Sequence, residues 1–175
     1  GEAWTAMVPL RRAQIFAQQN RWEDAFELAG TIAERFPEFR PQHEVDYLVG
    51  RCLSHQARFR EARESYERVV NSPAGARTET AAMAQWMIGE TYFQQERYDD
   101  AIAAYHRCER LFAFERWQAA ALLQAGKCHE AKGTYRDAIG LYAQLLKQYS
   151  NTTFAQDASQ RMRVAQQRAG ESKQR

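Results

Sequence analysis

The sequence predicts an all-α solenoid of four helix–turn–helix repeats followed by a C-terminal capping helix. Glycine and proline are scarce, with 9 and 4 residues in 175, and apolar residues recur at the three-to-four spacing of amphipathic helices. A fixed period of roughly 20–50 residues is typical of solenoids, in which each repeat buries its apolar face only against its neighbours. The recurring motif is an aromatic residue, two polar residues and alanine, at intervals of 37, 39 and 37 residues: Trp22-Glu23-Asp24-Ala25, Phe59-Arg60-Glu61-Ala62, Tyr98-Asp99-Asp100-Ala101 and Tyr135-Arg136-Asp137-Ala138.

The predicted repeats cover residues 6–41, 43–75, 80–115 and 117–152, and each contains a first helix before the motif and a second helix after it. Apolar side chains at helical spacing define the inner face of each helix. In the first helices these residues are Leu10, Ala13 and Phe16 in the first repeat, Tyr47, Leu48 and Leu53 in the second, Met83, Met87, Ile88 and Tyr92 in the third, and Leu122, Ala125 and His129 in the fourth. In the second helices they are Ala25, Leu28, Ala29 and Ile32 in the first repeat, Ala62, Tyr66 and Val69 in the second, Ala101, Ile102, Tyr105, Cys108 and Leu111 in the third, and Ala138, Leu141, Tyr142 and Leu145 in the fourth.

The segments between repeats contain residues that end helices. Pro37, Pro41 and Pro73 cannot continue a helix and mark the first two boundaries. After the last boundary, residues 154–169 form an amphipathic helix with a polar outer face, which we expect to cap the open end of the stack. Residues 170–175 have nothing to bury, so we expect a disordered tail after one continuous domain over residues 6–169.

Small residues recur where the two helices of a repeat should meet. Gly50, Gly89 and Gly126 each come twelve residues before a motif alanine, and a small side chain at both points lets the antiparallel helices approach closely. The motif aromatic is then expected to close the hairpin turn. In the last turn, Gly133 can adopt the positive φ of a helix end without steric penalty.

Composition excludes several classes of function. The formal net charge of +2 gives no strong field, so nucleic acid and anionic membranes are not expected as partners. No apolar run approaches the roughly 18–20 residues that span a bilayer. The first residues, Gly1-Glu2-Ala3-Trp4, resemble a trimmed start, so a leader or upstream domain would be invisible.

The three cysteines cannot all pair, and no Cys-x-x-Cys motif occurs. We expect Cys52, Cys108 and Cys128 to be small buried side chains, which favours a reducing compartment. Cys108 and Cys128 lie on helices that should pack together, so a disulfide between them is the alternative and would indicate an oxidising compartment.

The repeats resemble the tetratricopeptide repeat, whose units are helix–turn–helix hairpins of typically 34 residues. This resemblance covers roughly residues 6–165 and implies a right-handed α–α superhelix. The longer units, with the second-helix sequence Tyr142-Ala143-Gln144-Leu145-Leu146-Lys147-Gln148-Tyr149, are similar to those of bacterial envelope proteins, which favours the periplasm or envelope over the cytoplasm. The third repeat carries the family pattern most fully, in Trp86, Ile88-Gly89, Tyr92, Tyr98, Ala101, Tyr105 and Cys108.

The resemblance also implies a site, because ligand peptides of this family lie in a concave groove lined mainly by first helices. Aromatic side chains there could supply the rigid anchors typical of binding hot spots. Alternatively, the aromatics pack between repeats and the charged residues form a solvated face. The predicted partner-binding residues are Tyr47, Arg51, His55, Trp86, Glu90, Phe93, Leu123, Lys127 and Glu130, with Gln14 and Ser54 on the same surface.

An enzyme is not expected. The four histidines fall in different repeats without metal-ligand spacing, and no glycine-rich phosphate loop occurs. Cys128 and His129 are adjacent, but neighbouring helical residues point about 100° apart and do not form a nucleophile–base pair. His129 is better explained as a packed core residue. We therefore predict no catalytic residue, no metal and no cofactor.

The predicted function is a non-catalytic protein–protein interaction scaffold that binds a segment of a partner protein in its groove. Two alternatives stay open at this point. One is self-association through an exposed end of the stack, giving a homo-oligomer. The other is a regulatory domain excised from a larger multi-domain protein.

Overall fold

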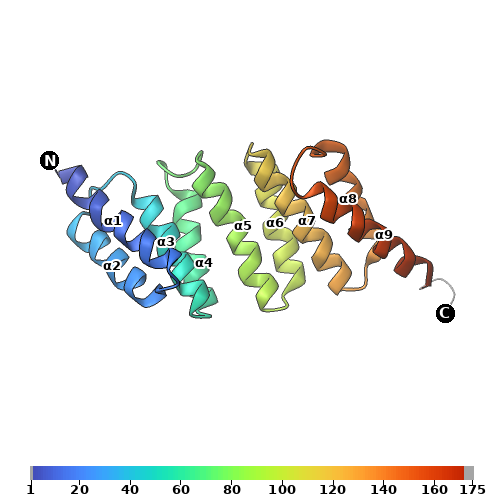
Figure 1. Ribbon diagram of the computed structural model, residues 1–175, viewed down its shortest axis with the longest axis horizontal. Helices are drawn as coiled ribbons and strands as arrows, with labels where there is room; N and C mark the ends of the chain where they lie inside the picture. The colour runs from blue at the N-terminus through green and yellow to red at the C-terminus, as the bar shows by residue number, and fades with distance from the viewer. Residues whose placement is uncertain (1, 172–175) are drawn as a thin grey trace. The chain divides into compact units, whose positions relative to one another are not determined.

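The computed structural model describes residues 2–171 of the chain, with side chains from Thr5 onward. Within these residues the secondary structure consists of helices without a strand, as the sequence predicts (Figure 1). The helices form four hairpins and one further helix: α1 Glu2–Gln18 and α2 Trp22–Arg35; α3 Gln42–His55 and α4 Phe59–Asn71; α5 Glu79–Gln94 and α6 Tyr98–Leu111; α7 Glu115–Ala131 and α8 Tyr135–Gln148; and α9 Ala155–Glu171.

The chain divides into two compact units, Gly1–Thr91 and Tyr92–Arg175. In the first unit α1 packs on α2, α2 on α3, and α3 on α4. In the second unit α6 packs on α7, α7 on α8, and α8 on α9. The helix α2 therefore lies between α1 and α3, and α8 lies between α7 and α9, as in a solenoid. The prediction of one continuous domain over residues 6–169 stays a prediction.

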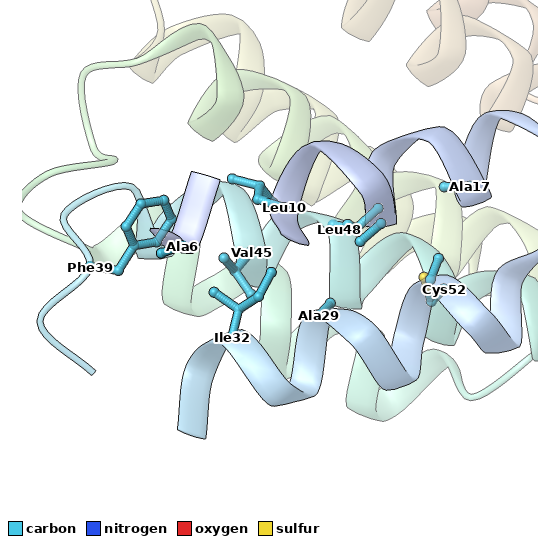
Figure 2. Packing of buried hydrophobic residues seen from close by; sticks show 11 residues of the cluster. Ala6, Leu10, Ala17, Ala29, Ile32, Phe39, Val45, Leu48 and Cys52 are labelled. Carbon is cyan, nitrogen blue, oxygen red and sulfur yellow. The ribbon is translucent and has the colours of Figure 1, made fainter. Parts of the chain in front are cut away.

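The core of the first unit is built from small and medium side chains of α1, α2 and α3. Alanines line much of it, and larger residues such as Leu10, Ile32 and Val45 fill the space between the helices (Figure 2). In the second unit the corresponding core contains Tyr142 and Leu145 from α8, with Ala158 and Ala165 of α9 packed into it. The helix α9 thus covers one side of this core, which is the capping role that the sequence predicts.

All four hairpin turns have the same backbone conformation. In the turn between α7 and α8, Gly133 has φ of 75°, and its N–H donates to the carbonyl of Glu130 at 2.9 Å. The N–H of Thr134 donates to the carbonyl of His129, also at 2.9 Å, which completes a Schellman motif. The other three turns repeat both bonds but place a residue with a β-carbon in the left-handed conformation: Asn20, Ala57 and Glu96, with φ of 61°, 57° and 58°.

Two of the recurring glycines, Gly50 and Gly126, accommodate a tyrosine ring of the second helix. A β-carbon at Gly50 would lie 2.6 Å from Cε1 of Tyr66, closer than real side chains approach. Gly126 faces Tyr142 in the same way, with 2.6 Å to Cζ. Both rings are fully buried. The close approach predicted at these positions is therefore made by an aromatic side chain lying over the glycine.

Two boundaries differ from the sequence prediction. The first helix begins at Glu2 rather than near residue 6. The last helix continues to Glu171, and its final turn is held by contacts of Glu171 with Gln167 and Arg168. The first two residues of the predicted disordered tail are therefore helical, and its other four lie outside the described residues. Cys52, Cys108 and Cys128 are buried thiols, so the alternative disulfide is not formed.

Candidate partner-binding site

The first unit contains a cleft of about 310 Å³ between its three first helices. Since α1, α3 and α5 all contribute, the cleft corresponds to the surface on which the sequence predicted partner binding. Its wall combines two glutamine amides, one carboxylate, one guanidinium, a phenol, an aliphatic hydroxyl and two apolar side chains. The lining residues are Gln14 and Gln18 of α1, Glu44, Tyr47, Leu48 and Arg51 of α3, and Thr80 and Met83 of α5.

Tyr47 is a half-buried aromatic residue held at the cleft wall. Its ring packs at a tilt on that of Tyr66, with 5.9 Å between centroids, and the Tyr66 hydroxyl lies 3.2 Å from Oγ of Ser54. Burial raises the pKa of Tyr47, against a smaller opposing effect of the charge on Arg51. The hydroxyl therefore stays protonated at neutral pH and offers a hydrogen-bond donor on a ring whose position is fixed by packing.

Arg51 and His55 are both oriented by Trp22 at the start of α2. The His55 imidazole stacks on the indole with 3.6 Å between centroids and 12° between planes. The Arg51 guanidinium lies 5.3 Å from the indole centroid, within range of a cation–π interaction. Burial, with the charge on Arg51, lowers the pKa of His55, so the imidazole is neutral at pH 7. The positive charge at this end of α3 is therefore carried by Arg51, which also lines the cleft.

The remaining predicted residues of α5 lie outside this cleft. Trp86 and Glu90 are half-buried residues of the first unit. Phe93 belongs to the second unit, where its ring meets Tyr98 edge-on with 5.7 Å between centroids. This contact closes the hairpin turn, as predicted for the motif aromatic, and it engages Phe93 inside the fold.

In the second unit the predicted residues of α7 are engaged by the core and by α9. Leu123 is 4% exposed and belongs to the core, so its side chain is not a surface contact. Lys127 Nζ lies 3.5 Å from a carboxylate oxygen of Asp157. Glu130 accepts a hydrogen bond from the Tyr142 hydroxyl, and its other oxygen lies 3.3 Å from Nη1 of Arg161. The sequence missed this because the partners Asp157 and Arg161 come from the capping helix rather than from a repeat.

The cleft also contains residues that the sequence analysis did not select: Gln18, Glu44, Leu48, Thr80 and Met83. Helical spacing could have found several of them. Gln18 lies one turn beyond Gln14, and Glu44 lies two turns before Arg51, so each shares a helix face with a predicted residue.

Among the described residues, no group of three or more His, Cys, Asp or Glu side chains is arranged to hold a metal ion. No described helix is both long and apolar enough to cross a membrane. His129 is partly buried, with Nδ1 2.8 Å from Oγ1 of Thr134 and 3.7 Å from a carboxylate oxygen of Asp137. Because Oγ1 of Thr134 also lies 3.2 Å from the carbonyl of His129, these contacts tie together the α7–α8 turn.

Comparisons with solved structures support the same fold. A Podosopora anserina putative kinesin light chain with nearly identical TPR-like repeats has a TM-score of 0.74 at 14% identity, covering 98% of this chain and 90% of that one. A tetratricopeptide repeat protein from Parabacteroides merdae has 0.71 at 14%, covering 99% and 64%. YrrB, described as a TPR protein with an unusual peptide-binding site, has 0.63 at 19%, covering 91% and 75%. At these identities the similarity shows the fold alone.

No curated protein gives a significant match to the sequence. The family comparison is more informative. The tetratricopeptide repeat family matches residues 10–79, 53–115 and 87–152, which together span most of the chain. This architecture is that of protein–protein interaction scaffolds, which are generally non-catalytic, and it implies protein or peptide partners. The repeated hairpins, their shared turn and the family match agree: the chain belongs to the tetratricopeptide repeat family.

Proposed function

We propose that this protein is a non-catalytic adaptor that binds an extended segment of a partner protein in the cleft between α1, α3 and α5. The observation that carries the proposal is the cleft itself, which brings six polar or charged side chains and two apolar ones together around about 310 Å³. It is lined by first helices only, and three of the residues selected from sequence, Gln14, Tyr47 and Arg51, lie on its wall.

The spacing of the glutamines favours an extended ligand. Gln14 and Gln18 are one turn apart, which is about 6 Å along a helix axis. In an extended peptide, equivalent backbone groups repeat every second residue, at about 6.6–6.8 Å. Oε1 of Gln14 already accepts a hydrogen bond from Nη1 of Arg11 at 2.8 Å, so Gln14 offers its N–H donors to the ligand. Gln18 can both donate and accept, and together the two amides match successive backbone groups on one side of such a peptide.

The charged residues favour a ligand with an acidic side chain or carboxylate. Arg51 is half-buried against Trp22, so its guanidinium is already oriented when the ligand arrives. Glu44 lies two turns away on the same helix, about 10 Å along the axis, and would repel an acidic group placed at that end. Tyr47 and Met83 provide the apolar contact between these charges. The opposite charges of Arg51 and Glu44 therefore favour one orientation of the ligand along α3, with its acidic group near Arg51.

Selection from a random peptide library tests this proposal. Peptides selected against the wild-type protein should be enriched in Asp and Glu, and Arg51→Glu should weaken their binding at least about tenfold, because it removes an oriented charge and adds a repulsive one. The matched control is Arg60→Glu on α4, where the side chain is 88% exposed and pairs with Glu64 one turn away. Selected peptides that bind wild type and Arg51→Glu equally would refute the cleft as the site.

A further inference from the structure

The helix α1 carries an apolar face that the described chain leaves uncovered. Val8 is 69% exposed and Ile15 is 49% exposed. They lie seven residues apart, which is two helical turns, so both side chains lie on the same side of α1. This side is not the one that contacts α2, because the core of the first unit uses Leu10, Ala13 and Ala17 of α1 instead.

The repeat register shows what kind of element such a face holds. The residues 37 positions later, one repeat period along, are Val45 and Cys52 of α3, and they are 1% and 0% exposed. They are covered because α2 packs against α3, and Figure 2 shows the Val45 side chain directed toward Ile32 of α2. Val8 and Ile15 therefore occupy on α1 the positions that, on α3, are covered by the preceding helix α2.

The charge of this face differs from that of its counterpart. Between the two apolar residues α1 carries Arg11 and Arg12, both exposed, where α3 has Leu48 and Val49. From Thr5 to Gln18, the part of α1 whose side chains are described, no acidic residue occurs. Arg11 donates to Oε1 of Gln14 and the Arg12 guanidinium lies 5.4 Å from the Phe16 ring centroid, and neither contact neutralises the charge. A second copy pairing through the same face would bring four arginines together, which is unfavourable at low salt.

We propose that Val8, Arg11, Arg12 and Ile15 form a docking face, the α1 seat, for an acidic amphipathic helix of another protein. The apolar stripe of the incoming helix covers Val8 and Ile15, as α2 covers Val45 and Cys52 in the same unit. Acidic residues beside that stripe pair with the two arginines. The α1 seat borders the cleft proposed above, because Nη1 of Arg11 donates a hydrogen bond to Oε1 of Gln14 at 2.8 Å. Val8 and Ile15 do not line the cleft, so Ile15→Glu tests the seat without altering the cleft wall.

The chain supplies a suitable probe, because α2 already fits the equivalent face of α3. A labelled peptide with the sequence of residues 22–36, acetylated and amidated, contains four acidic residues and one arginine. Its binding to the full-length protein is measured by fluorescence anisotropy at 50 mM and 500 mM salt. Ile15→Glu should raise the Kd at least about tenfold, since burial of one such side chain contributes roughly 1.5–3 kcal/mol.

Reversing both arginines in the same chain, R11E with R12E, should raise the Kd about fivefold at low salt and less at high salt, because exposed charge pairs are screened. A peptide with its four acidic residues replaced by glutamine should show the same loss on the wild-type protein. Val164→Glu on α9 is the matched control, since Val164 is an exposed valine (50%) of the second unit and should leave binding unchanged.

Four results would overturn the proposal. The first is no binding of the peptide to the wild-type protein at millimolar concentration. The second is equal binding to wild type and Ile15→Glu. Another is loss of binding in Arg51→Glu but not in Ile15→Glu, which would place the peptide in the cleft. The last is a mass that rises with protein concentration in wild type but not in Ile15→Glu, which would make a second copy the occupant. Circular dichroism confirms that each variant is folded.

Discussion

The packing of Gly50 against Tyr66 gives a quantitative prediction about stability. A β-carbon at position 50 would lie 2.6 and 2.7 Å from ring atoms of a fully buried tyrosine whose hydroxyl lies 3.2 Å from Oγ of Ser54. Gly50→Ala therefore forces the ring or the helix to move, at a typical overpacking cost of about 1–3 kcal/mol. The substitution also gains about 0.8–1 kcal/mol of helix propensity. We expect a net loss of up to about 2 kcal/mol.

A second glycine in the same unit isolates the packing cost. Gly30 lies inside α2, and a β-carbon there meets nothing within 4 Å. Gly30→Ala should therefore stabilise the protein by about 0.5–1 kcal/mol through helix propensity alone. Because the propensity gain is common to both variants, the difference between them measures the contact with Tyr66, which we expect to be about 1–3 kcal/mol.

Urea unfolding followed by far-UV circular dichroism measures both variants, with an unchanged m-value as the condition for comparing them. Replacing Tyr66 by leucine in the Gly50→Ala background should recover at least about 1 kcal/mol relative to additivity, since the two positions are in contact. If Gly50→Ala stabilises the protein as much as Gly30→Ala does, the ring does not occupy the space above Gly50 and the reasoning is refuted.

Three further predictions concern the turns, the histidines and the last helix. Glu96→Gly should raise the free energy of unfolding by about 0.5–1 kcal/mol. The left-handed φ of 58° costs a residue with a β-carbon about 1–2 kcal/mol, and the greater freedom of glycine in the unfolded chain offsets part of the gain from removing that cost. A loss of stability in urea unfolding would contradict this prediction. Burial lowers the pKa of His106 and His129 in the folded protein below the ordinary 6.5. As the pH decreases, the unfolded chain therefore binds protons at these histidines before the folded protein does. The free energy of unfolding should fall from about pH 6.5 downward, until the pH has passed the pKa values of the folded protein. This fall should be shallower in His129→Gln, and an identical pH profile would show that His129 does not contribute. Arg161→Ala removes ion pairs with Glu130 and Asp157 at 3.3 and 3.0 Å. The stability of α9 against local opening should fall by up to about 1 kcal/mol, so its amide hydrogens should exchange faster. Unchanged exchange would mean that apolar packing alone holds α9.

The sequence predicted the hairpins well, because the signals that define them are local and repeated. The aromatic-x-x-Ala motif marks the start of each second helix, and the structure begins α2, α4, α6 and α8 at Trp22, Phe59, Tyr98 and Tyr135. The glycine twelve residues earlier indicated a close contact but not its partner. Only the structure shows that the ring four residues after the motif alanine, Tyr66 for Gly50, fills the space.

The candidate site was less predictable, because it depends on contacts between different repeats. Position in the family pattern selected Leu123, Lys127 and Glu130 as groove residues. The structure places the first in the core and pairs the other two with α9, a helix outside the repeat pattern. Trp22 was expected to close its own turn, yet its ring stacks on His55 of the next hairpin. These contacts depend on which side chain from a neighbouring helix fills a given space, and the spacing of the repeats does not determine this.

The most direct test of the adaptor function is hydrogen exchange measured by mass spectrometry, with and without a peptide selected against the wild-type protein. Binding in the cleft should slow exchange in α1, α3 and the first turns of α5, which supply Gln14, Tyr47 and Met83, while α2 and α4 stay unchanged. Slower exchange confined to α2 and α4, or to the second unit, would contradict the assignment of the cleft as the partner-binding site.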